Sequence, residues 1–271
     1  MGLLRRGRPG GSALSVEHAA GMLRAARRAV ALTGAGVSTE SGLPDFRSPG
    51  GLWAGVDPMR VASLQAFRRD PAAFYAFYLG RLTRLGGAQP NPAHRALADL
   101  EWAGALSAVI TQNVDGLHQA AGSRRVLELH GTLRRARCVD CGRRADIAVL
   151  TDALAAGGQP HCPTCAGPLK PDIVLFGEML PLTIFAEADA LCREADLLLV
   201  VGSSLTVTPA ADLPQVVLDH GGRLIIVNRE PTPYDVRAAL VIRENAGRLL
   251  PALAALAAGR PREAAEEEHH A

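Results

Sequence analysis

Short apolar runs without polar alternation recur along the chain. They cover residues 29–33, 106–111, 126–129, 173–176, 197–201 and 224–227. Runs of this length and kind are typical of parallel β-strands that are buried on both faces of a sheet. We therefore predict a strand at each of these positions.

Apolar residues at helical spacing fill several of the stretches between these runs. Helices are predicted over residues 15–28, 71–85, 92–102, 183–194 and 210–219. Ser15 and Asn91 stand where helix N-caps are expected, and Gly221 and Gly222 follow the last helix as a stop signal. The alternation of strands and helices predicts an α/β fold with a doubly wound parallel sheet, whose ligand binds at the carboxyl ends of the strands.

Composition and charge exclude several classes of protein. The chain has 271 residues, of which 48% are hydrophobic, and its formal net charge is +2. A nearly neutral chain lacks the basic bias of a dedicated nucleic-acid-binding protein. No apolar run reaches the roughly 18 residues of a membrane span, and no apolar segment with a cleavage site follows the basic start of the chain. We therefore expect a cytoplasmic protein without a membrane or nucleic-acid partner.

The cysteines are spaced as metal ligands. Cys138 and Cys141 form one Cys-x-x-Cys pair, Cys162 and Cys165 form another, and 20 residues separate the two pairs. This spacing matches a tetrahedral four-thiolate zinc site, and four protein ligands leave no open position for a substrate. We therefore predict one structural zinc ion, with two redox pairs or idle thiols as the alternative. Cys192 stands alone in a helical stretch and is interpreted as a core thiol.

Three polar segments contain residue types with potential chemistry. The first, GAGVSTESGLPDFR at residues 34–47, follows the strand at 29–33 and begins with a glycine-rich turn that a phosphate can approach closely. The others are TQNVDGLH at residues 111–118 and ELHG at residues 128–131. An Asn/Asp turn and a structural histidine are the ordinary interpretations of the last two. A histidine at the carboxyl end of a strand, beside a glycine, is nevertheless a candidate general base.

Together with PDIVLFGE at 171–178, GSSLTVTPA at 202–210 and IIVN at 225–228, these segments resemble the sirtuins in order and approximate spacing. The resemblance covers residues 16–253 and favours the bacterial deacetylase branch. Sirtuins are NAD-dependent protein-lysine deacylases with a Rossmann-like domain and a small zinc-containing domain. The resemblance therefore implies NAD and one zinc ion as cofactors, and acylated lysine side chains of proteins as partners.

The resemblance also implies a discontinuous large domain. Residues 15–47, 104–136 and 171–257 would form the NAD-binding, Rossmann-like domain. A helical insertion at 48–103 and a zinc ribbon at 137–170 would form the small domain, with NAD and the acyl-lysine peptide bound in the cleft between the two domains. Residues 1–14 and 258–271 are expected to be flexible tails, because the end of the chain is acidic and has no large apolar residue.

Site residues carry over from the family motif by motif. Those implied to bind NAD are Gly34, Ala35, Gly36, Ser38, Glu40, Pro44, Asp45, Phe46, Arg47, Gln112, Asn113, Val114, Asp115, Gly202, Ser203, Ser204, Asn228, Arg229, Glu230 and Ala246, and those implied to border the peptide are Val174, Phe176, Gly177 and Glu178. The peptide would pair through its backbone as an added strand. Asn113 and Asp115 would position the nicotinamide ribose, and His130 would act as general base on a ribose hydroxyl after nicotinamide has left.

The acyl preference rests on a few positions of the helical insertion. Tyr78 and Arg81 match the Tyr-x-x-Arg signature of sirtuins that remove succinyl and malonyl groups, in which an arginine pairs with the acyl carboxylate. The aromatic pattern at Phe74, Tyr75 and Phe77 fits the bacterial deacetylases better. We favour deacetylation and keep desuccinylation or demalonylation as the alternative, since a four-residue match on a helix is a weak motif.

Two further functions compete with deacylation. A mono-ADP-ribosyltransferase would use the same NAD pocket, but transfer to a protein nucleophile does not require the base-assisted second step that His130 would supply. A non-enzymatic NAD sensor is the other competitor, and the presence of Asn113, Asp115 and His130 argues against it.

Overall fold

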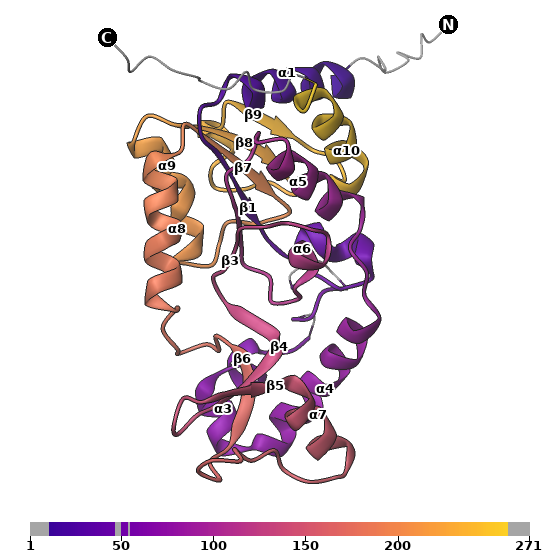
Figure 1. Ribbon diagram of the computed structural model, residues 1–271, viewed down its shortest axis with the longest axis vertical. Helices are drawn as coiled ribbons and strands as arrows, with labels where there is room; N and C mark the ends of the chain where they lie inside the picture. Colours follow the sequence, from indigo (N-terminus) through magenta and orange to yellow (C-terminus); the bar gives the residue numbers. More distant parts are fainter. Residues whose placement is uncertain (1–10, 47–49, 54, 260–271) are drawn as a thin grey trace, which may run out of the picture.

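The computed structural model describes residues 11–46, 50–53 and 55–259. In this part of the chain, a six-stranded and a three-stranded β-sheet lie at opposite ends of an elongated molecule (Figure 1). None of the described helices combines the length and the apolar character that a bilayer span requires.

The larger sheet is entirely parallel. Its strands, in spatial order, are β3 (Val126–Glu128), β2 (Val109–Thr111), β1 (Ala29–Thr33), β7 (Leu197–Val201), β8 (Arg223–Val227) and β9 (Leu240–Ile242). Counted within the sheet, this is the order 3-2-1-4-5-6 of a doubly wound dinucleotide-binding fold. The order reverses between β1 and β7, so the loops after these two strands lie where such folds bind their ligands.

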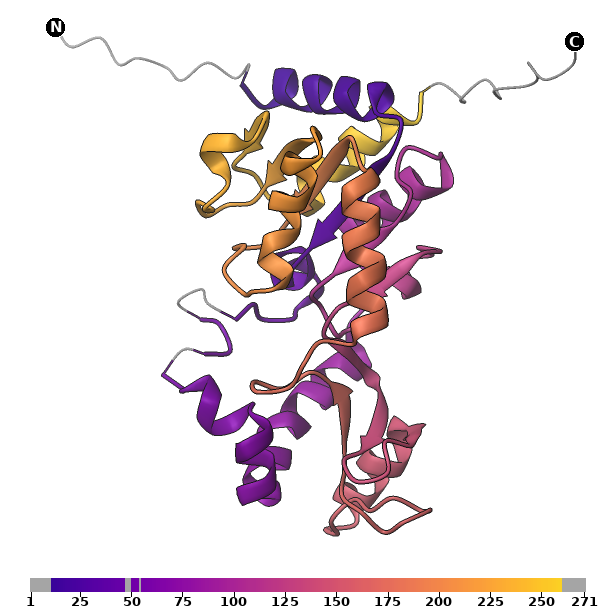
Figure 2. The same cartoon turned by 90° about the vertical axis from the view of Figure 1, so that its left-hand side faces the viewer.

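Helices cover both faces of the larger sheet (Figures 1 and 2). On one face lie α1 (Gly11–Ala25), α5 (Pro92–Trp102) and α10 (Ala246–Ala257), and on the other lie α8 (Leu182–Glu194) and α9 (Leu213–Asp219). Side chains of each strand alternate between the two cores: in β1, Ala29 and Ala31 belong to the first, and Val30 and Leu32 to the second. Since neither face meets water, the strands have uninterrupted apolar sequences.

The smaller sheet is antiparallel, with β4 (Gly131–Cys138) between β5 (Arg144–Asp146) and β6 (Leu169–Ile173). Beside it lie α2 (Pro58–Val61), α3 (Leu64–Arg69), α4 (Pro71–Gly87) and α7 (Ile147–Ala155). A separate core joins these helices to the sheet and includes Phe67, Phe74, Tyr75, Tyr78, Leu133, Leu150, Ile173 and Leu175. Two segments that are far apart in the sequence therefore form one packed unit.

Four short elements occupy loops around the larger sheet. They are η1 (Ala35–Ser41), α6 (Leu117–Ala120), η2 (Ala210–Asp212) and η3 (Asp235–Arg237). η1 and α6 belong to the first two polar segments of the sequence analysis. These segments are therefore placed at the carboxyl ends of β1 and β2, as the doubly wound fold requires.

The structure confirms the doubly wound parallel sheet. The strands at 29–33 and 197–201 and the helix at 92–102 have the predicted bounds. Asn91 caps α5, because its side chain accepts hydrogen bonds from the backbone N–H groups of Ala93 and His94.

The strand predicted at residues 173–176 is wrong. The observed strand is Leu169–Ile173, and it pairs antiparallel with β4 in the smaller sheet. The following residues continue as a connecting segment, in which Val174 N–H donates to His130 O and Phe176 N–H donates to Ala62 O. The run has the apolar character of a central strand because Ile173 and Leu175 are buried in the core of the smaller sheet.

Other predicted boundaries differ from the observed ones, as in the strand predicted at 106–111, which begins at Val109. α1 begins at Gly11, so Ser15 lies inside the helix rather than at its N-cap, and the helix includes residues 11–14 of the predicted tail. The helix predicted at 210–219 is the short turn η2 followed by α9. α5 packs against the larger sheet, although its residues fall within the predicted insertion at 48–103.

Candidate active site

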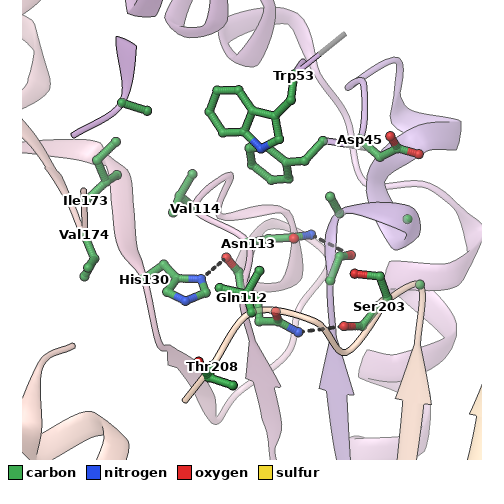
Figure 3. Close-up of a pocket in the computed structure, with 18 of the residues that line it drawn as sticks. Asp45, Trp53, Gln112, Asn113, Val114, His130, Ile173, Val174, Ser203 and Thr208 are labelled. Atoms are coloured by element: carbon green, nitrogen blue, oxygen red, sulfur yellow. Dashed lines mark hydrogen bonds between the residues drawn. The ribbon is translucent and has the colours of Figure 1, made fainter. Parts of the chain in front are cut away.

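A cavity of about 1100 Å³ lies between the carboxyl edge of the larger sheet and the segment that follows β6. Its lining comes from the loops after β1, β2, β7 and β8 and from residues 173–180. In Figure 3, Ile173 and Val174 lie on one side of the cavity and Ser203 lies on the other. Ligand pockets commonly have volumes of about 300–1,000 Å³, so this cavity has room for a dinucleotide and part of a second substrate.

Most site residues predicted from the sequence line this cavity. They are Gly34, Ala35, Gly36, Glu40, Asp45, Phe46, Tyr78, Gln112, Asn113, Val114, His130, Val174, Phe176, Gly177, Glu178, Gly202, Ser203, Ser204, Asn228, Arg229, Glu230 and Ala246. Ser38, Pro44 and Asp115 instead line a smaller cavity of about 50 Å³, which shares Asn113 with the larger one. Arg47 and the side chain of Arg81 lie outside the described residues.

A contact between two loops accounts for the glycines after β1. Gly36 N–H donates to Gly202 O over 2.8 Å. A Cβ atom on Gly36 would lie 2.8 Å from Gly202 Cα, and one on Gly34 would lie 2.9 Å from Gly202 O, so neither loop could carry a side chain without shifting. Gly202 itself has φ +61°, a conformation that residues with side chains rarely adopt. The glycines therefore bring the ends of β1 and β7 together, whether or not a phosphate is bound.

His130 connects the two sheets. It lies between β3 and β4, its carbonyl oxygen accepts the Val174 N–H over 2.9 Å, and its Nδ1 lies 2.9 Å from the Gln112 carbonyl oxygen (Figure 3). Because a carbonyl oxygen can only accept, Nδ1 carries the proton and Nε2 keeps its lone pair in the neutral ring. Burial lowers the pKa of His130, and the hydrogen bond to Gln112 opposes this shift without reversing it. The cavity is therefore lined by a neutral imidazole that can accept a proton at Nε2.

The side chains of Asn113 and Asp115 are fixed by Ser38. Asn113 Nδ2 donates to Ser38 Oγ over 3.0 Å and to Gly34 O over 3.2 Å. Ser38 Oγ in turn donates to Asp115 Oδ2 over 2.7 Å. Both amide protons of Asn113 are used in these contacts, so its Oδ1 is left to interact with a ligand.

Two buried histidines lie behind this network, and the sequence analysis assigned neither of them. His94 Nε2 lies 3.3 Å from Ser38 Oγ, and His118 Nε2 lies 2.9 Å from Thr33 Oγ1. His94 Nδ1 accepts the Asn91 N–H, so the proton of the neutral ring is on Nε2 and is donated to Ser38. Burial lowers the pKa of His94 to about 4 and that of His118 to about 3. Both rings are therefore neutral hydrogen-bonding groups at neutral pH.

Aromatic rings form the wall of the cavity beside the smaller sheet. The ring centroid of Trp53 lies 5.3 Å from that of Phe46, 6.0 Å from Phe77 and 6.3 Å from Phe176. Trp53 and Tyr78 both line the cavity. Trp53 belongs to no motif and its ring contacts come from three separate segments, so no local signal in the sequence identifies it.

A buried ion pair shapes the segment after β6. Lys170 Nζ lies 3.0 Å from Glu178 Oε2 and donates to Ile173 O over 2.6 Å, and the Lys170 side chain is 5% exposed. Glu178 Oε2 also accepts the Leu175 N–H over 2.8 Å. These contacts close a turn at Gly177, whose φ is +86°. Glu178 therefore holds the conformation of the segment in addition to lining the cavity.

The carboxylate of Glu40 has a structural partner as well. Its Oε2 accepts the Gly247 N–H over 2.7 Å at the start of α10. Asn245, the residue at the N-cap of this helix, makes no side-chain capping bond. Glu40 therefore caps α10 from the loop after β1 and fixes Ala246, the cavity-lining first residue of the helix.

The four cysteines of the smaller sheet form a cluster that fits one zinc ion. Their Sγ atoms all lie within 4.8 Å of one another, with 3.5 Å between Cys138 and Cys165 and 3.8 Å between Cys141 and Cys162. A tetrahedral zinc ion with Zn–S bonds of about 2.3 Å places its sulfur ligands about 3.8 Å apart. Cys192 is buried in the second core of the larger sheet, as expected of a core thiol.

Comparisons with known proteins agree with this geometry. The profile of the Sir2 family matches residues 34–209. A Sulfolobus acidocaldarius protein named "NAD-dependent protein deacetylase" is 51% identical over 236 residues, which cover 87% of this chain and 92% of the relative. A Thermococcus kodakarensis protein named "NAD-dependent protein deacylase" is 46% identical over 239 residues, which cover 87% of this chain and 93% of the relative.

Solved structures of similar proteins share the fold. One, described as "Structural Basis for the Mechanism and Regulation of Sir2 Enzymes", is 44% identical with a TM-score of 0.83 and covers 90% of this chain and 97% of its own. Another, described as "Sir2-p53 peptide-NAD+", is 39% identical with a TM-score of 0.77 and covers 85% of this chain and 93% of its own. The matched profile spans most of the cavity-lining loops. This match and the identity to the two relatives show that the chain belongs to the Sir2 family.

Proposed function

We propose that this protein is an NAD-dependent protein-lysine deacetylase, which transfers the acyl group of an acyl-lysine side chain to ADP-ribose and releases nicotinamide. The observation that carries the proposal is His130, a neutral imidazole with a basic Nε2 in a cavity large enough for a dinucleotide and an acyl-lysine. Membership of the Sir2 family and the names of the relatives support the same reaction.

The loops at the carboxyl edge of the larger sheet would hold NAD. The first glycine loop and residues 202–204 would contact the diphosphate, and residues 228–230 with Ala246 would contact the adenosine. Gln112, Asn113 and Asp115 would hold the nicotinamide half, at the border between the large and the small cavity. When bound, NAD supplies an anomeric carbon from which nicotinamide can leave.

Two side chains would then direct the chemistry. Asn113, whose amide nitrogen is fixed by Ser38 and Gly34, would orient the ribose through Oδ1. His130 Nε2 would accept the proton of a ribose hydroxyl, which activates that oxygen as a nucleophile. The lowered pKa of His130 supports this role, because the ring must be neutral before it can accept a proton. Phe46 and Trp53 would exclude water from the site.

We favour an acetyl group over an acidic one as the acyl group that is removed. Trp53, Ala62 and Tyr78 line the cavity, and the acyl group would lie against them. The described residues that line the cavity include one arginine, Arg229. It follows β8, at the end of the cavity where the nucleotide would bind. Desuccinylation is the second candidate, because Tyr78 of the Tyr-x-x-Arg signature does line the cavity, and it would require Arg81 to reach the acyl carboxylate.

The smaller sheet would stabilise the site rather than supply chemistry. Cys138, Cys141, Cys162 and Cys165 would hold one zinc ion with no open coordination position. Because β4 begins at residue 131, β6 ends at 173 and α5 packs on the larger sheet, we place the small domain at residues 48–90 and 131–175. None of the five cysteines, all of which lie among the described residues, forms a disulfide, and this favours a reducing compartment such as the cytoplasm.

A peptide panel tests the proposal. The full chain is incubated with NAD and one lysine peptide in acetylated and succinylated forms, and all products are identified by mass spectrometry. We expect free lysine, nicotinamide and acyl-ADP-ribose in equal amounts, with the acetylated peptide as the better substrate. ADP-ribose attached to peptide or protein would identify a transferase, NAD binding without turnover would identify a sensor, and faster release from the succinylated peptide would reverse the acyl preference.

A further inference from the structure

The nucleotide end of the cavity is built from two segments that one arginine ties together. Asn228 and Glu230 follow β8, and Glu244 and Ala246 follow β9. All four residues line the cavity. β8 and β9 are parallel neighbours, so both segments leave the same edge of the sheet. Arg243 precedes the second segment but does not itself line the cavity.

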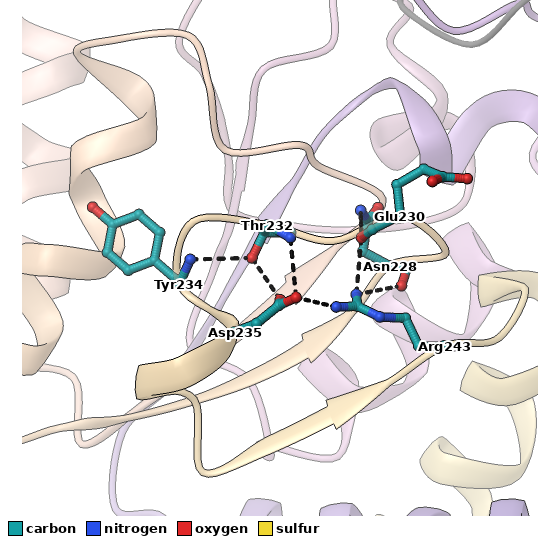
Figure 4. Close-up of polar contacts among 6 residues, drawn as sticks. All are labelled: Asn228, Glu230, Thr232, Tyr234, Asp235 and Arg243. Carbon is teal, nitrogen blue, oxygen red and sulfur yellow. Dashed lines mark hydrogen bonds and ion pairs between the residues drawn. The ribbon is translucent and has the colours of Figure 1, made fainter.

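Arg243 makes contacts to two backbone carbonyls and to one carboxylate (Figure 4). Its Nη1 donates to Asn228 O over 2.9 Å and to Glu230 O over 2.8 Å, and its Nη2 forms an ion pair with Asp235. The Glu230 carboxylate points away from the guanidinium in Figure 4. The contact to Glu230 is therefore through its backbone, and the charge of Arg243 is balanced by Asp235.

Asp235 holds the far end of the same loop. Its Oδ2 accepts the Thr232 N–H over 3.1 Å, and its Oδ1 accepts the Thr232 hydroxyl over 2.8 Å. The Thr232 hydroxyl oxygen in turn accepts the Tyr234 N–H over 3.3 Å. Residues 228–234 contain no helix or strand, so the bonds from Arg243 and Asp235 take the place of a backbone ladder in ordering this loop.

We infer that Arg243, together with Asp235, is a positioning residue for the adenosine half of NAD. The pair fixes the loop that carries Asn228 and Glu230 in one conformation before the nucleotide binds. A loop that samples several conformations binds its ligand with an affinity reduced by the competent fraction, so loss of the pair weakens nucleotide binding. The inference rests on the proposed use of NAD. It goes beyond that proposal because it gives Arg243 and Asp235, which do not line the cavity, a role in the affinity for the nucleotide.

The effect is confined to binding because the chemistry takes place elsewhere. Asn113 and His130 lie at the ends of β2 and β3, whereas Arg243 follows β9 at the opposite edge of the six-stranded sheet. Once the nucleotide is bound, the position of these two residues does not depend on Arg243. A loss of affinity without a loss of turnover therefore distinguishes positioning of the nucleotide from a general structural role.

Binding of ADP-ribose, measured by calorimetry, tests the inference without catalysis. We expect Arg243→Met to raise the Kd of ADP-ribose by about tenfold, the change that follows if the loop is competent about a tenth of the time. Arg243→Lys keeps the charge but lacks the planar fork of the guanidinium, so we expect a smaller rise. Asp235→Asn should act in the same direction. In steady state the KM for NAD should rise in proportion, while kcat and the KM for acetylated peptide stay within about twofold.

Arg193→Met is the matched control. Arg193 forms an ion pair with Asp189 on α8, with 53% of its side chain exposed, and does not line the cavity. This variant loses an arginine–aspartate pair of the same kind and should bind ADP-ribose like the wild type.

Three results would overturn the inference. The first is an unchanged Kd in folded Arg243→Met, and the second is an equal loss of kcat and of peptide affinity. If Arg243→Met does not fold, Arg243→Lys is measured in its place. The third result is then an unchanged Kd of ADP-ribose in Arg243→Lys. A wild-type chain that binds no ADP-ribose would overturn the proposed function as well, which separates the two failures.

Discussion

The two sheets of this molecule are stabilised in different ways. In the larger sheet every residue of β1 and β7 is buried, and a separate apolar core covers each face. In the smaller sheet β6 is buried throughout, but β4 mixes buried residues with three exposed arginines and β5 is largely exposed. Burial of apolar area stabilises the first by about 25 cal/mol per Å². The second has less apolar area to bury, and a bound metal would supply the stability that burial does not.

The difference shows how the active site depends on each sheet. The loops that are proposed to bind the nucleotide all follow strands of the larger sheet. His130 belongs to the connection between the sheets, with its ring bonded to Gln112 after β2 and its carbonyl bonded to Val174 after β6. Nucleotide binding should therefore survive damage to the smaller sheet, whereas deacetylation should not.

Loss of the metal should have the broadest effect, because zinc content and deacetylation are lost together. Cys138→Ser removes one thiolate, and because metal binding is coupled to folding we expect loss of zinc and deacetylation below about 1% of wild type, with the Kd of ADP-ribose changed less than about threefold. Elemental analysis, an activity assay and calorimetry measure the three quantities. Cys192→Ala, which removes a buried thiol from the core of the larger sheet, should retain its zinc. A zinc-free Cys138→Ser that is folded and fully active would contradict the account.

Removal of the connecting imidazole should come next. His130→Ala deletes the proposed general base, so we expect the rate of lysine release to fall by about 10²- to 10⁴-fold. The exposed His220 at the end of α9 provides the control, and His220→Ala should release lysine at the wild-type rate. Retention of more than about a tenth of the activity in His130→Ala would exclude it as the base.

Acid should destabilise the larger sheet through its buried histidines. The folded pKa values of His94, about 4, and His118, about 3, lie below the ordinary value of 6.5, so between these values the unfolded chain binds protons that the folded chain does not. The free energy of unfolding therefore falls as the pH drops below about 6.5, by about 2 kcal/mol for each histidine at pH 5. Urea unfolding at pH 7 and pH 5 measures this loss, and His118→Gln should show a smaller loss than the wild type. A free energy of unfolding that is equal at the two pH values would refute this role of the histidines.

A side chain between the loops after β1 and β7 should have the smallest effect of the four. Gly36→Ala places a Cβ atom 2.8 Å from Gly202 Cα, so we expect a loss of about 1–3 kcal/mol in stability and weaker binding of ADP-ribose. Gly80→Ala in α4 is the control, because nothing lies within 4 Å of its Cβ and alanine favours the helix by about 1 kcal/mol. Chemical unfolding of both variants makes the comparison. Equal stability of the two would show that the loop contact is not as tight as described.

The same difference between the sheets decided what could be predicted from sequence. β1, β7 and β8 are buried on both faces, so their apolar runs are local signals that need no knowledge of the partner strands. β4 contains three arginines and a cysteine, and its strand character arises from pairing with β6, about 35 residues later in the chain. The run at 173–176 was apolar for a different reason, burial under α3 and α4, and the period-based prediction could not separate the two causes.

The candidate site shows a similar division. Its motif residues could be named because they follow strands or have characteristic spacing, as His130 and the cysteines do. Trp53, His94 and Lys170 could not, because each acts through contacts with segments far away in the sequence. Glu40 and Gly36 were named for nucleotide contact, and their partners within the protein, Gly247 and Gly202, became evident from the fold alone.

The central claim is that His130 acts after nicotinamide has left. A comparison of two activities, nicotinamide exchange and lysine release, tests it in the same variant. Exchange of labelled nicotinamide into NAD requires only the reversible first step, whereas lysine release requires both. On one acetylated peptide, His130→Ala should lose lysine release by about 10²-fold or more and keep most of its exchange. Asn113→Ala should lose both, since in the proposed mechanism Asn113 positions the ribose for the first step. An equal loss of exchange and lysine release in folded His130→Ala would contradict the claim.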